Sequence, residues 1–272
     1  MAQFSTGATL NKENLCLPGL NNKKVVITAG ACGIGYAIAR FLHAQGAQVS
    51  ICDVDAVALE NAKSALEGCF AFEADVSSEA DVEAFFKAVL KDFGRLDALI
   101  NNAGIAGPTG KIEQLSVAEW RRCLDICLTG QFLCARQAVP LMKANGGGCL
   151  VNIGSAASKH GYAFRTPYAA AKFGVIGLTE SLAKELGPDN IRVNAILPGI
   201  VEGPRMDNVI RARAAETGIS FDDMKDEYMI KVSLRRMVSP DDVASSVGFL
   251  LSDFGKNISG QSLAVDGNVE TL

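Results

Sequence analysis

Hydrophobic residues along the chain occur in short continuous runs that alternate with longer amphipathic stretches. The short runs are rich in β-branched residues, which favours strands, and we predict strands over 25–28, 49–51, 69–72, 98–100, 149–153, 193–196 and 262–265. Helical spacing of apolar residues predicts helices over 34–44, 81–93, 119–142, 168–186 and 240–251. Strands that are apolar throughout suit a sheet covered on both faces. The pattern therefore predicts an α/β fold, a doubly wound, seven-stranded parallel sheet with helices on both faces.

Two segments depart from this alternation. Residues 1–20 are polar and irregular, and we interpret them as an N-terminal extension before a single domain over 21–272. Residues 203–237 are charged and predict one or two short helices. Ligands of such sheets bind at the carboxyl ends of the strands, so we expect 203–237 to form a variable lid over the substrate site.

Composition narrows the function classes. The chain has 272 residues, of which 49% are hydrophobic and 21% charged, as expected for one soluble domain. A net charge of −4 argues against nucleic acid as a partner. The N-terminus lacks a signal-peptide pattern, and no apolar stretch reaches the roughly 18 residues needed to span a membrane. We therefore expect a cytoplasmic protein that does not bind membranes.

The cysteines do not form a recognisable metal or disulfide pattern. The chain has eight cysteines and two histidines, with no Cys-x-x-Cys pair. Cys123, Cys127 and Cys134 would share one helical face, but no further Cys or His completes a tetrad. We expect small buried thiols in a reducing compartment and no metal site.

A glycine-rich turn joins the first predicted strand to the first predicted helix. It reads Thr28-Ala-Gly-Ala-Cys-Gly-Ile-Gly35. Such a turn lets the backbone approach a pyrophosphate, to which the helix N-terminus offers N–H donors and a favourable dipole. We predict cofactor contacts from Gly30, Cys32, Gly33, Ile34 and Gly35, with a simple tight strand-to-helix turn as the alternative.

Asp53 ends the second predicted strand, twenty residues after Gly33. A carboxylate there accepts hydrogen bonds from the adenosine ribose hydroxyls and repels a 2′-phosphate. No Arg lies within 52–56 to bind that phosphate. This favours NAD over NADP as the cofactor; the alternative is that Asp53 caps the following helix.

Further motifs follow in a consistent order. They are Asp75-Val76, Asn101-Asn-Ala-Gly104, Ser155 thirteen residues before Tyr168, Tyr168-Ala-Ala-Ala-Lys172, and Pro198-Gly199. Together with the glycine turn, this series resembles the short-chain dehydrogenase/reductase family over about residues 21–272, in its single-domain form. The resemblance implies a Rossmann-type dinucleotide-binding domain that is catalytic, with helices packing across a two-fold axis in a homotetramer or homodimer. It also implies cofactor contacts from Asp75, Val76, Asn102, Ala103, Gly104, Tyr168, Lys172, Pro198, Gly199 and Val201.

The chemistry explains the spacing of the last motif. Tyr168 and Lys172 are four residues apart and share a helix face. An ammonium group beside the phenol lowers the phenol pKa toward the working pH. Tyr168 would then remove the hydroxyl proton of an alcohol, or donate a proton to a carbonyl, while Ser155 holds the reacting oxygen.

Three positions depart from the family pattern. Ala29 stands where the first turn glycine is usual, and Gly203 stands where a Thr often contacts the nicotinamide carboxamide. Cys127 stands where an Asn is expected in the long central helix, and we assign it the fourth catalytic position. A thiol keeps the main-chain carbonyl but is not expected to reproduce the amide hydrogen bonds that shape the helix bend. We predict altered turnover, and not a dead enzyme.

The pocket walls are expected after Gly104, over 156–165, and after Gly199. Candidates are Ile105, Ala157, His160, Phe164, Arg165, Glu202, Arg205 and Met206. Among them, we predict substrate contacts from Ala157, Arg165 and Arg205, together with Ser155. Arg165 could bind a carboxylate or sulfonate, or lie in a surface ion pair. The mixed polarity favours a small polar secondary alcohol such as a sugar, polyol or hydroxy acid.

Three hypotheses remain open from sequence. The first is an NAD-dependent oxidoreductase that transfers a hydride between NAD and a secondary alcohol or ketone. The second is a 3-oxoacyl (β-ketoacyl) reductase, which Asp53 and the net charge oppose. The third is a catalytically weakened NAD-binding regulatory protein, which Cys127 favours and the intact Ser155, Tyr168 and Lys172 oppose.

Overall fold

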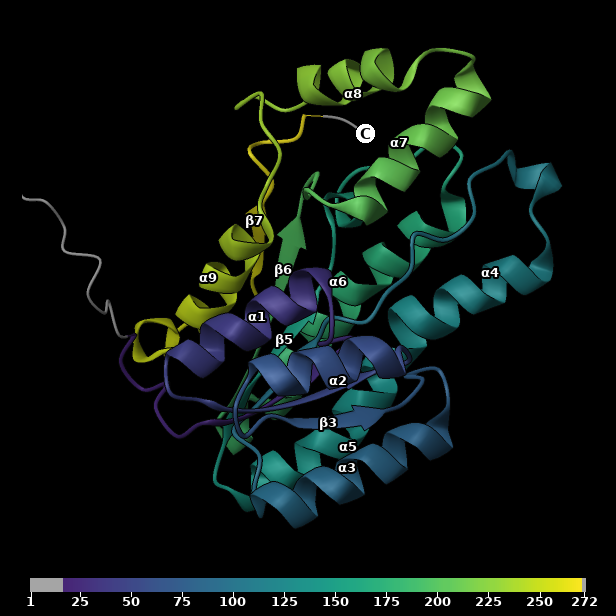
Figure 1. The fold of residues 1–272 in the computed structure, drawn as a ribbon. Coiled ribbons are helices and arrows are strands. Elements are labelled where there is room, and N and C mark those ends of the chain that lie inside the picture. The colour runs from purple at the N-terminus through teal and green to yellow at the C-terminus, as the bar shows by residue number, and fades with distance from the viewer. Residues whose placement is uncertain (1–16, 271–272) are drawn as a thin grey trace, which may run out of the picture.

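All seven strands pair in parallel in one sheet. The computed structural model describes residues 17–270, and the strand order is β3-β2-β1-β4-β5-β6-β7 (Figure 1). The strands are β1 (Lys24–Thr28), β2 (Gln48–Asp53), β3 (Phe70–Glu73), β4 (Ala98–Asn101), β5 (Gly148–Ile153), β6 (Ile191–Pro198) and β7 (Ser262–Val265). The order reverses direction between β1 and β4, and a ligand cleft is expected at such a switch point. The predicted fold class is confirmed.

Helices cover both faces of this sheet. On one face α1 (Gly33–Ala44), α2 (Ala56–Ala65) and α9 (Pro240–Leu251) pack against the strands around Ile38, Leu59 and Val247. On the other face lie α3 (Glu79–Phe93), α5 (Gly130–Ala144) and α6 (Thr166–Leu186), with a second core around Phe85 and Met142. Because both faces are covered, β1 and β4 are apolar and buried almost throughout.

Two helix predictions needed correction. The helix α2 was missed because only Leu59 and Ala62 of its ten residues are buried, which leaves almost no hydrophobic periodicity to detect. The helix predicted over 119–142 is not continuous. It consists of α4 (Val117–Leu124), a π-helical turn (Asp125–Thr129) and α5. A π turn inserts one extra residue per turn and often marks a functional site, and this one contains Cys127.

The segment 203–237 forms two helices, α7 (Pro204–Thr217) and α8 (Phe221–Ile230), beyond the carboxyl end of β6 (Figure 1). They have a hydrophobic cluster of their own, in which Ile210, Met224 and Tyr228 are buried with Ile200. This segment therefore packs on the domain as a separate layer, with its own small core.

The predicted extension over 1–20 falls mainly on residues 1–16, which lie outside the described residues. Residues 17–20 belong to the domain, since Leu20 is fully buried and Leu17 packs against the core. The Leu17 N–H donates to Gln45 Oε1, and Pro18 O accepts from the Asp253 N–H. The packed structure thus begins before the predicted boundary.

The strand β7 forms one edge of the sheet. Its Leu263 and Ala264 are exposed.

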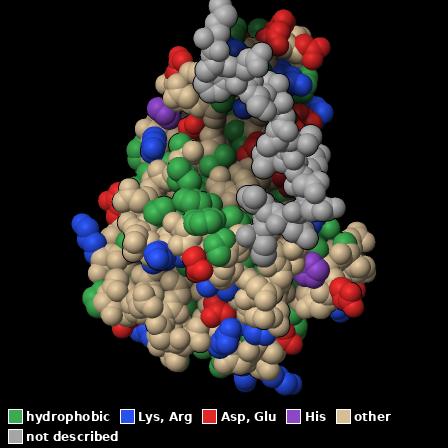
Figure 2. Space-filling model, turned by 90° about the vertical axis from the view of Figure 1, so that its left-hand side faces the viewer, with side chains coloured by type: hydrophobic (Ala, Val, Ile, Leu, Met, Phe, Trp, Pro, Cys, Tyr) green, Lys and Arg blue, Asp and Glu red, His purple; other side chains and the backbone are tan. Residues whose placement is uncertain are grey.

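Figure 2 looks at the side that lies to the left in Figure 1, and hydrophobic side chains gather near its middle with charged ones around them. Within residues 17–270 the structure contains no helix that is long and apolar enough to cross a membrane.

Candidate active site

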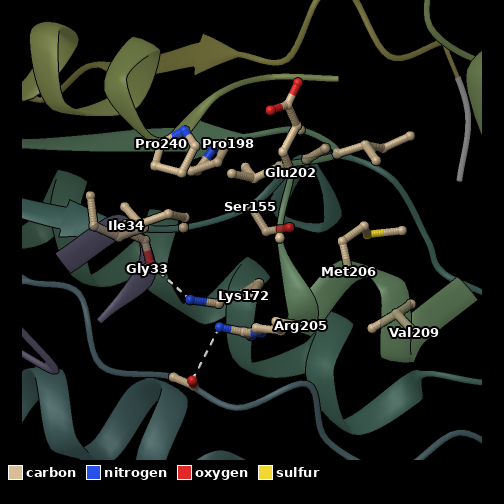
Figure 3. Close-up of a pocket in the computed structure, with 18 of the residues that line it drawn as sticks. Gly33, Ile34, Ser155, Lys172, Pro198, Glu202, Arg205, Met206, Val209 and Pro240 are labelled. Atoms are coloured by element: carbon tan, nitrogen blue, oxygen red, sulfur yellow. Dashed lines mark hydrogen bonds between the residues drawn. The ribbon is translucent and has the colours of Figure 1, made fainter. Parts of the chain in front are cut away.

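A cavity of about 470 Å³ opens at the carboxyl ends of the central strands (Figure 3). Its floor comes from the glycine turn after β1 and from the ends of β4, β5 and β6, and its outer wall comes from α7 and α8. Of the residues predicted for catalysis, Ser155, Tyr168 and Lys172 all line it. The topology therefore brings side chains together that are far apart in the sequence.

The glycine turn has the shape that a bound pyrophosphate requires. A Cβ at Gly30 would lie 2.6 Å from Ile51 Cγ2, and one at Gly35 would lie 2.0 Å from Ala29 O, so both positions require glycine for packing. Gly33 has φ +53° and open space around its Cβ position. The start of α1 is thus bare toward the cavity, which fits a phosphate group on the helix N-terminus.

Ala29, which stands where the family usually has glycine, adopts φ +49°. An L-residue with a side chain is uncommon in this left-handed region. The turn is held by Asn102, whose side-chain amide donates to Thr28 O and Ala29 O. Thr28 Oγ1 in turn accepts the N–H groups of Asn102 and Ala103, which ties the end of β4 to the turn.

Asp53 lies at the end of β2 and is 8% exposed. Its Oδ2 accepts the Ala31 N–H from the glycine turn, and its Oδ1 accepts the Val54 N–H at 2.8 Å. The alternative that Asp53 caps the next helix is wrong. The cap of α2 is Asp55, whose carboxylate accepts the Ala58 N–H. Asp53 is thus positioned against the phosphate turn, as an adenosine-ribose ligand would be.

The remaining predicted cofactor residues divide into two groups. Asn102, Gly104, Pro198, Gly199 and Val201 line the main cavity together with Cys32, Gly33 and Ile34. Asp75 lies instead in a second hollow beside Val54, and its carboxylate accepts from Arg122 and Ser77. The side chain of Val76 is buried in the hydrophobic core that contains Phe85.

Lys172 and Ser155 surround the phenol of Tyr168. Lys172 is 3% exposed and donates to Ile153 O at 2.8 Å, which points its ammonium into the cavity (Figure 3). That ammonium is 5.8 Å from the centre of the Tyr168 ring. Ser155 follows β5 and lines the same cavity as Tyr168, and its Oγ accepts the Ala157 N–H.

These neighbours determine the acidity of Tyr168. Burial of the phenol raises its pKa, because desolvation disfavours the phenolate. The positive charges of Lys172, Arg205 and Arg165, with the Ser155 hydrogen bond, outweigh burial and lower the pKa below its usual value of 10.0. A phenol with a lowered pKa can exchange protons with substrate near neutral pH.

Cys127 is fully buried in the π turn, next to the catalytic lysine. Its Sγ lies 3.4 Å from Ile105 N and 3.5 Å from Ile105 O. The sulfur therefore contacts both backbone groups of one residue at this bend, and altered turnover caused by Cys127 stays a prediction. The hydrogen bond from Cys123, with the Lys172 charge, lowers the pKa of Cys127.

The predicted substrate residues differ in whether they line the cavity. Arg165 and Arg205 line the cavity, as do Glu202 and Met206, and Arg165 is not in a surface ion pair but buried. Ala157 is fully buried beneath the cavity because it packs against the Cys127 and Tyr168 cluster. Three further candidates are absent from the cavity wall: Ile105, His160 and Phe164.

Two tyrosines of the cavity wall were not named as candidates in the sequence analysis. Tyr162 and Tyr228 line the cavity, and their hydroxyls hydrogen-bond to one another. Tyr162 lies in the predicted wall segment 156–165, whereas Tyr228 lies in α8, 66 residues away. No local pattern could have indicated their pairing. Among residues 17–270, no three His, Cys, Asp or Glu side chains gather as they would around a metal ion.

Comparison with known proteins places the chain among oxidoreductases. The family model described as "Enoyl-(Acyl carrier protein) reductase" matches residues 29–269. Levodione reductase of Leifsonia aquatica is 36% identical over 252 residues, covering 90% of this chain and 93% of that protein. Cis-4-hydroxycyclohexanecarboxylate dehydrogenase of Sinomonas cyclohexanicum is 37% identical over 245 residues, covering 89% of this chain and 94% of that protein.

Solved structures agree with this placement. The crystal structure of levodione reductase matches with a TM-score of 0.87 and 35% identity, over 91% of this chain and 97% of that one. The NAD⁺-bound xylitol dehydrogenase structure matches with a TM-score of 0.88 and 28% identity, over 92% of this chain and 99% of that one. The chain therefore belongs to the short-chain dehydrogenase/reductase family and is an oxidoreductase that acts on CH–OH groups.

Proposed function

We propose that the protein interconverts a small, polar secondary alcohol and its ketone. The observation that carries this proposal is the meeting of Ser155, Tyr168 and Lys172 in one cavity that continues to the open glycine turn. The names of relatives support the substrate class, since one acts on levodione and another on a hydroxycyclohexanecarboxylate. The cavity of about 470 Å³ must also admit the nicotinamide, which leaves room for a small substrate.

Each catalytic residue has a separate task in the proposed reaction. Hydride transfer is the chemistry that bound NAD supplies. In oxidation, Ser155 holds the substrate hydroxyl and Tyr168 takes its proton, so the carbonyl forms as the hydride leaves the carbinol carbon. In reduction, Tyr168 returns the proton to the carbonyl oxygen. Lys172 stabilises the phenolate in both directions, and its own position is fixed by Ile153 O.

The cofactor contacts follow from the geometry of the turn. Gly33 and the first turn of α1 would hold the pyrophosphate, and Asp53 would accept the adenosine ribose hydroxyls. Asn102, Gly104, Pro198, Gly199 and Val201 would line the nicotinamide side. The test is an absorbance assay for NADH formation with NAD⁺ and a panel of polyols, sugars and hydroxy acids.

Three outcomes of this assay are distinct. NADH formation with at least one small polar alcohol supports the proposal. A strong preference for NADPH with 3-oxoacyl substrates would instead identify a β-ketoacyl reductase. Cofactor binding without turnover of any substrate would identify a regulatory NAD-binding protein.

We also propose a cytoplasmic homotetramer, or a homodimer. All seven cysteines of the described residues are free thiols, which suits a reducing compartment. Phe132 on α5 and Phe173 on α6 are about half exposed, and Leu263 is exposed on the edge strand β7. Apolar surface on two sides gives room for more than one interface. Light scattering of the purified protein would measure the assembly.

A further inference from the structure

Arg165 is a buried cation that has no acidic partner within the described residues. It is 5% exposed, and no carboxylate lies within ion-pair distance of it. Its Nη2 donates to Ala106 O, and its Nε is buried with no hydrogen-bond partner. An unpaired buried charge is strongly destabilising unless something compensates it. The fold therefore keeps a buried guanidinium that no carboxylate of the described residues neutralises.

Two aromatic rings fix the position of this guanidinium. Its central carbon is 4.9 Å from the centre of the Tyr162 ring and 4.6 Å from the centre of the Tyr168 ring. Tyr162 is held in turn by its hydroxyl contact with Tyr228 on α8. Stacked rings occupy the faces of a guanidinium and leave its edge for hydrogen bonds. Arg165 is thus preorganised, and it lines the same cavity as the catalytic hydroxyl.

The cavity wall does not supply the missing negative charge. Four charged side chains line it: Arg165, Lys172, Arg205 and Glu202. Glu202 is the single carboxylate among them, and in Figure 3 its carboxylate points away from Lys172 and Arg205. It is exposed to solvent. Three cations against one exposed carboxylate leave the cavity positive.

Arg205 differs from Arg165 in its surroundings. It is exposed, donates to Gly104 O beside the predicted cofactor path, and acts electrostatically on Cys32 in the glycine turn. Its charge is therefore close to the expected cofactor phosphates. Arg165 differs in that its guanidinium lies over the Tyr168 ring and is buried.

We infer that Arg165 binds a carboxylate of the substrate, so that the enzyme acts on a hydroxy acid and its oxo acid. A planar guanidinium edge matches a carboxylate geometrically and forms charge-assisted hydrogen bonds with it. Because the guanidinium lies against the Tyr168 ring, the carboxylate must be only a few bonds from the carbinol. This inference rests on the proposed function, of which it names the substrate class.

The test compares short hydroxy acids with their uncharged methyl esters, by NADH formation. We expect kcat/KM to favour the acid over its ester by roughly tenfold or more. Arg165→Met should reduce this acid-to-ester ratio by roughly 10- to 100-fold, mainly through KM of the acid. Arg165→Lys should restore part of the ratio, because a charge remains without the planar edge. Hydroxysulfonates are assayed as a third class of substrate, and their kcat/KM shows whether the site prefers a carboxylate over a sulfonate.

The matched control is Arg213→Met. Arg213 is a partly buried arginine on α7 that stacks on Phe164 at 4.8 Å and donates to Ala163 O, but it does not line the cavity. Its loss should leave the acid-to-ester ratio unchanged. NAD binding, followed by NADH fluorescence, reports whether each variant is folded.

Three results would overturn the inference. Equal loss of acid and ester turnover in Arg165→Met would make Arg165 a packing residue of the Tyr168 cluster. Loss of the acid-to-ester preference in Arg205→Met, but not in Arg165→Met, would show that Arg205 and not Arg165 binds the anion. Turnover of polyols with no preference for acids would leave the proposed function intact and reject the carboxylate. Absence of NADH formation from every alcohol would reject the proposed function itself.

Discussion

The cofactor half and the substrate half of the cavity are built by different means. On the predicted cofactor side, the wall consists of backbone and glycine positions at the ends of β1 and β4, where Gly33 leaves the N-terminus of α1 bare. On the predicted substrate side, the wall consists of individual side chains on the 156–165 loop, α7 and α8. A backbone site depends on local conformation, whereas a side-chain site depends on which residues the tertiary fold brings together.

This difference explains which departures from the family pattern are tolerated. Ala29 keeps a left-handed conformation because Asn102 holds its carbonyl from β4. Cys127, which stands where an Asn is expected, contacts both backbone groups of Ile105 through its sulfur. In each case main-chain partners define the geometry, so a different side chain can keep it. No such substitution is expected at Tyr168, whose hydroxyl reacts directly.

The largest effect is therefore expected from Tyr168→Phe. Loss of the proton-transfer group should lower kcat by about a thousandfold, while NAD binding should remain largely intact because the phosphate turn is built elsewhere. Steady-state rates and NADH fluorescence measure the two quantities. Retained activity would show that another group carries the proton.

A smaller effect is expected at the cofactor side from Asp53→Asn. Removing the negative charge should raise KM for NAD by roughly tenfold, because a charged acceptor beside the ribose is lost. The preference for NAD over NADP should become smaller for the same reason. Asp55→Asn is the matched control, since an amide still caps α2. An unchanged ratio of NAD to NADP efficiency would remove Asp53 from cofactor selection.

A pH shift is expected from Arg205→Gln. Arg205 helps to lower the pKa of Tyr168, so its loss should raise that pKa. Oxidation needs the phenolate, so its rate profile should move to higher pH; reduction needs the phenol, so its activity should extend to higher pH. Arg211→Gln, on the same helix but stacked on Phe221, should leave both profiles in place. Identical profiles in all three proteins would exclude Arg205 from tuning Tyr168.

The smallest effect is expected from Cys127→Asn. An amide makes stronger hydrogen bonds to Ile105 than a thiol, so turnover should change by roughly two- to fivefold. Cys127→Ala removes both contacts and should also lower the melting temperature, because the partly buried Ile105 N–H and C=O groups lose their partner. A turnover rate for Cys127→Asn that equals the wild-type rate would show that turnover does not depend on whether this side chain is a thiol or an amide.

Much of the cofactor half could be predicted from sequence because its signals are local. Hydrophobic runs indicate buried strands, the glycine spacing indicates the turn, and Asp53 follows its strand directly. The short helix α2 was not predicted because its two buried residues do not create a hydrophobic period. The π turn was not predicted because the hydrophobic pattern of 119–142 is that of one continuous helix.

The substrate half shows where sequence reasoning stops. Arg165 was expected either at a ligand or in a surface ion pair, and its burial between Tyr162 and Tyr168 could not be foreseen. Ala157 was placed at the substrate by proximity in sequence, but its side chain turns into the core. Tyr228 was unidentifiable because it comes from a helix whose docking depends on its own small hydrophobic cluster.

The sequence by itself determined the α/β class, the glycine turn, the spacing of Tyr168 and Lys172, and the position of Asp53 at the end of the second strand. These features depend on periodicity and on neighbours within a few residues, where chain geometry fixes the outcome. The tertiary structure decided the charge balance of the cavity, the exposure of each arginine and the contacts of Cys127. Those depend on residues distant in sequence, because burial and electrostatic interactions act through space.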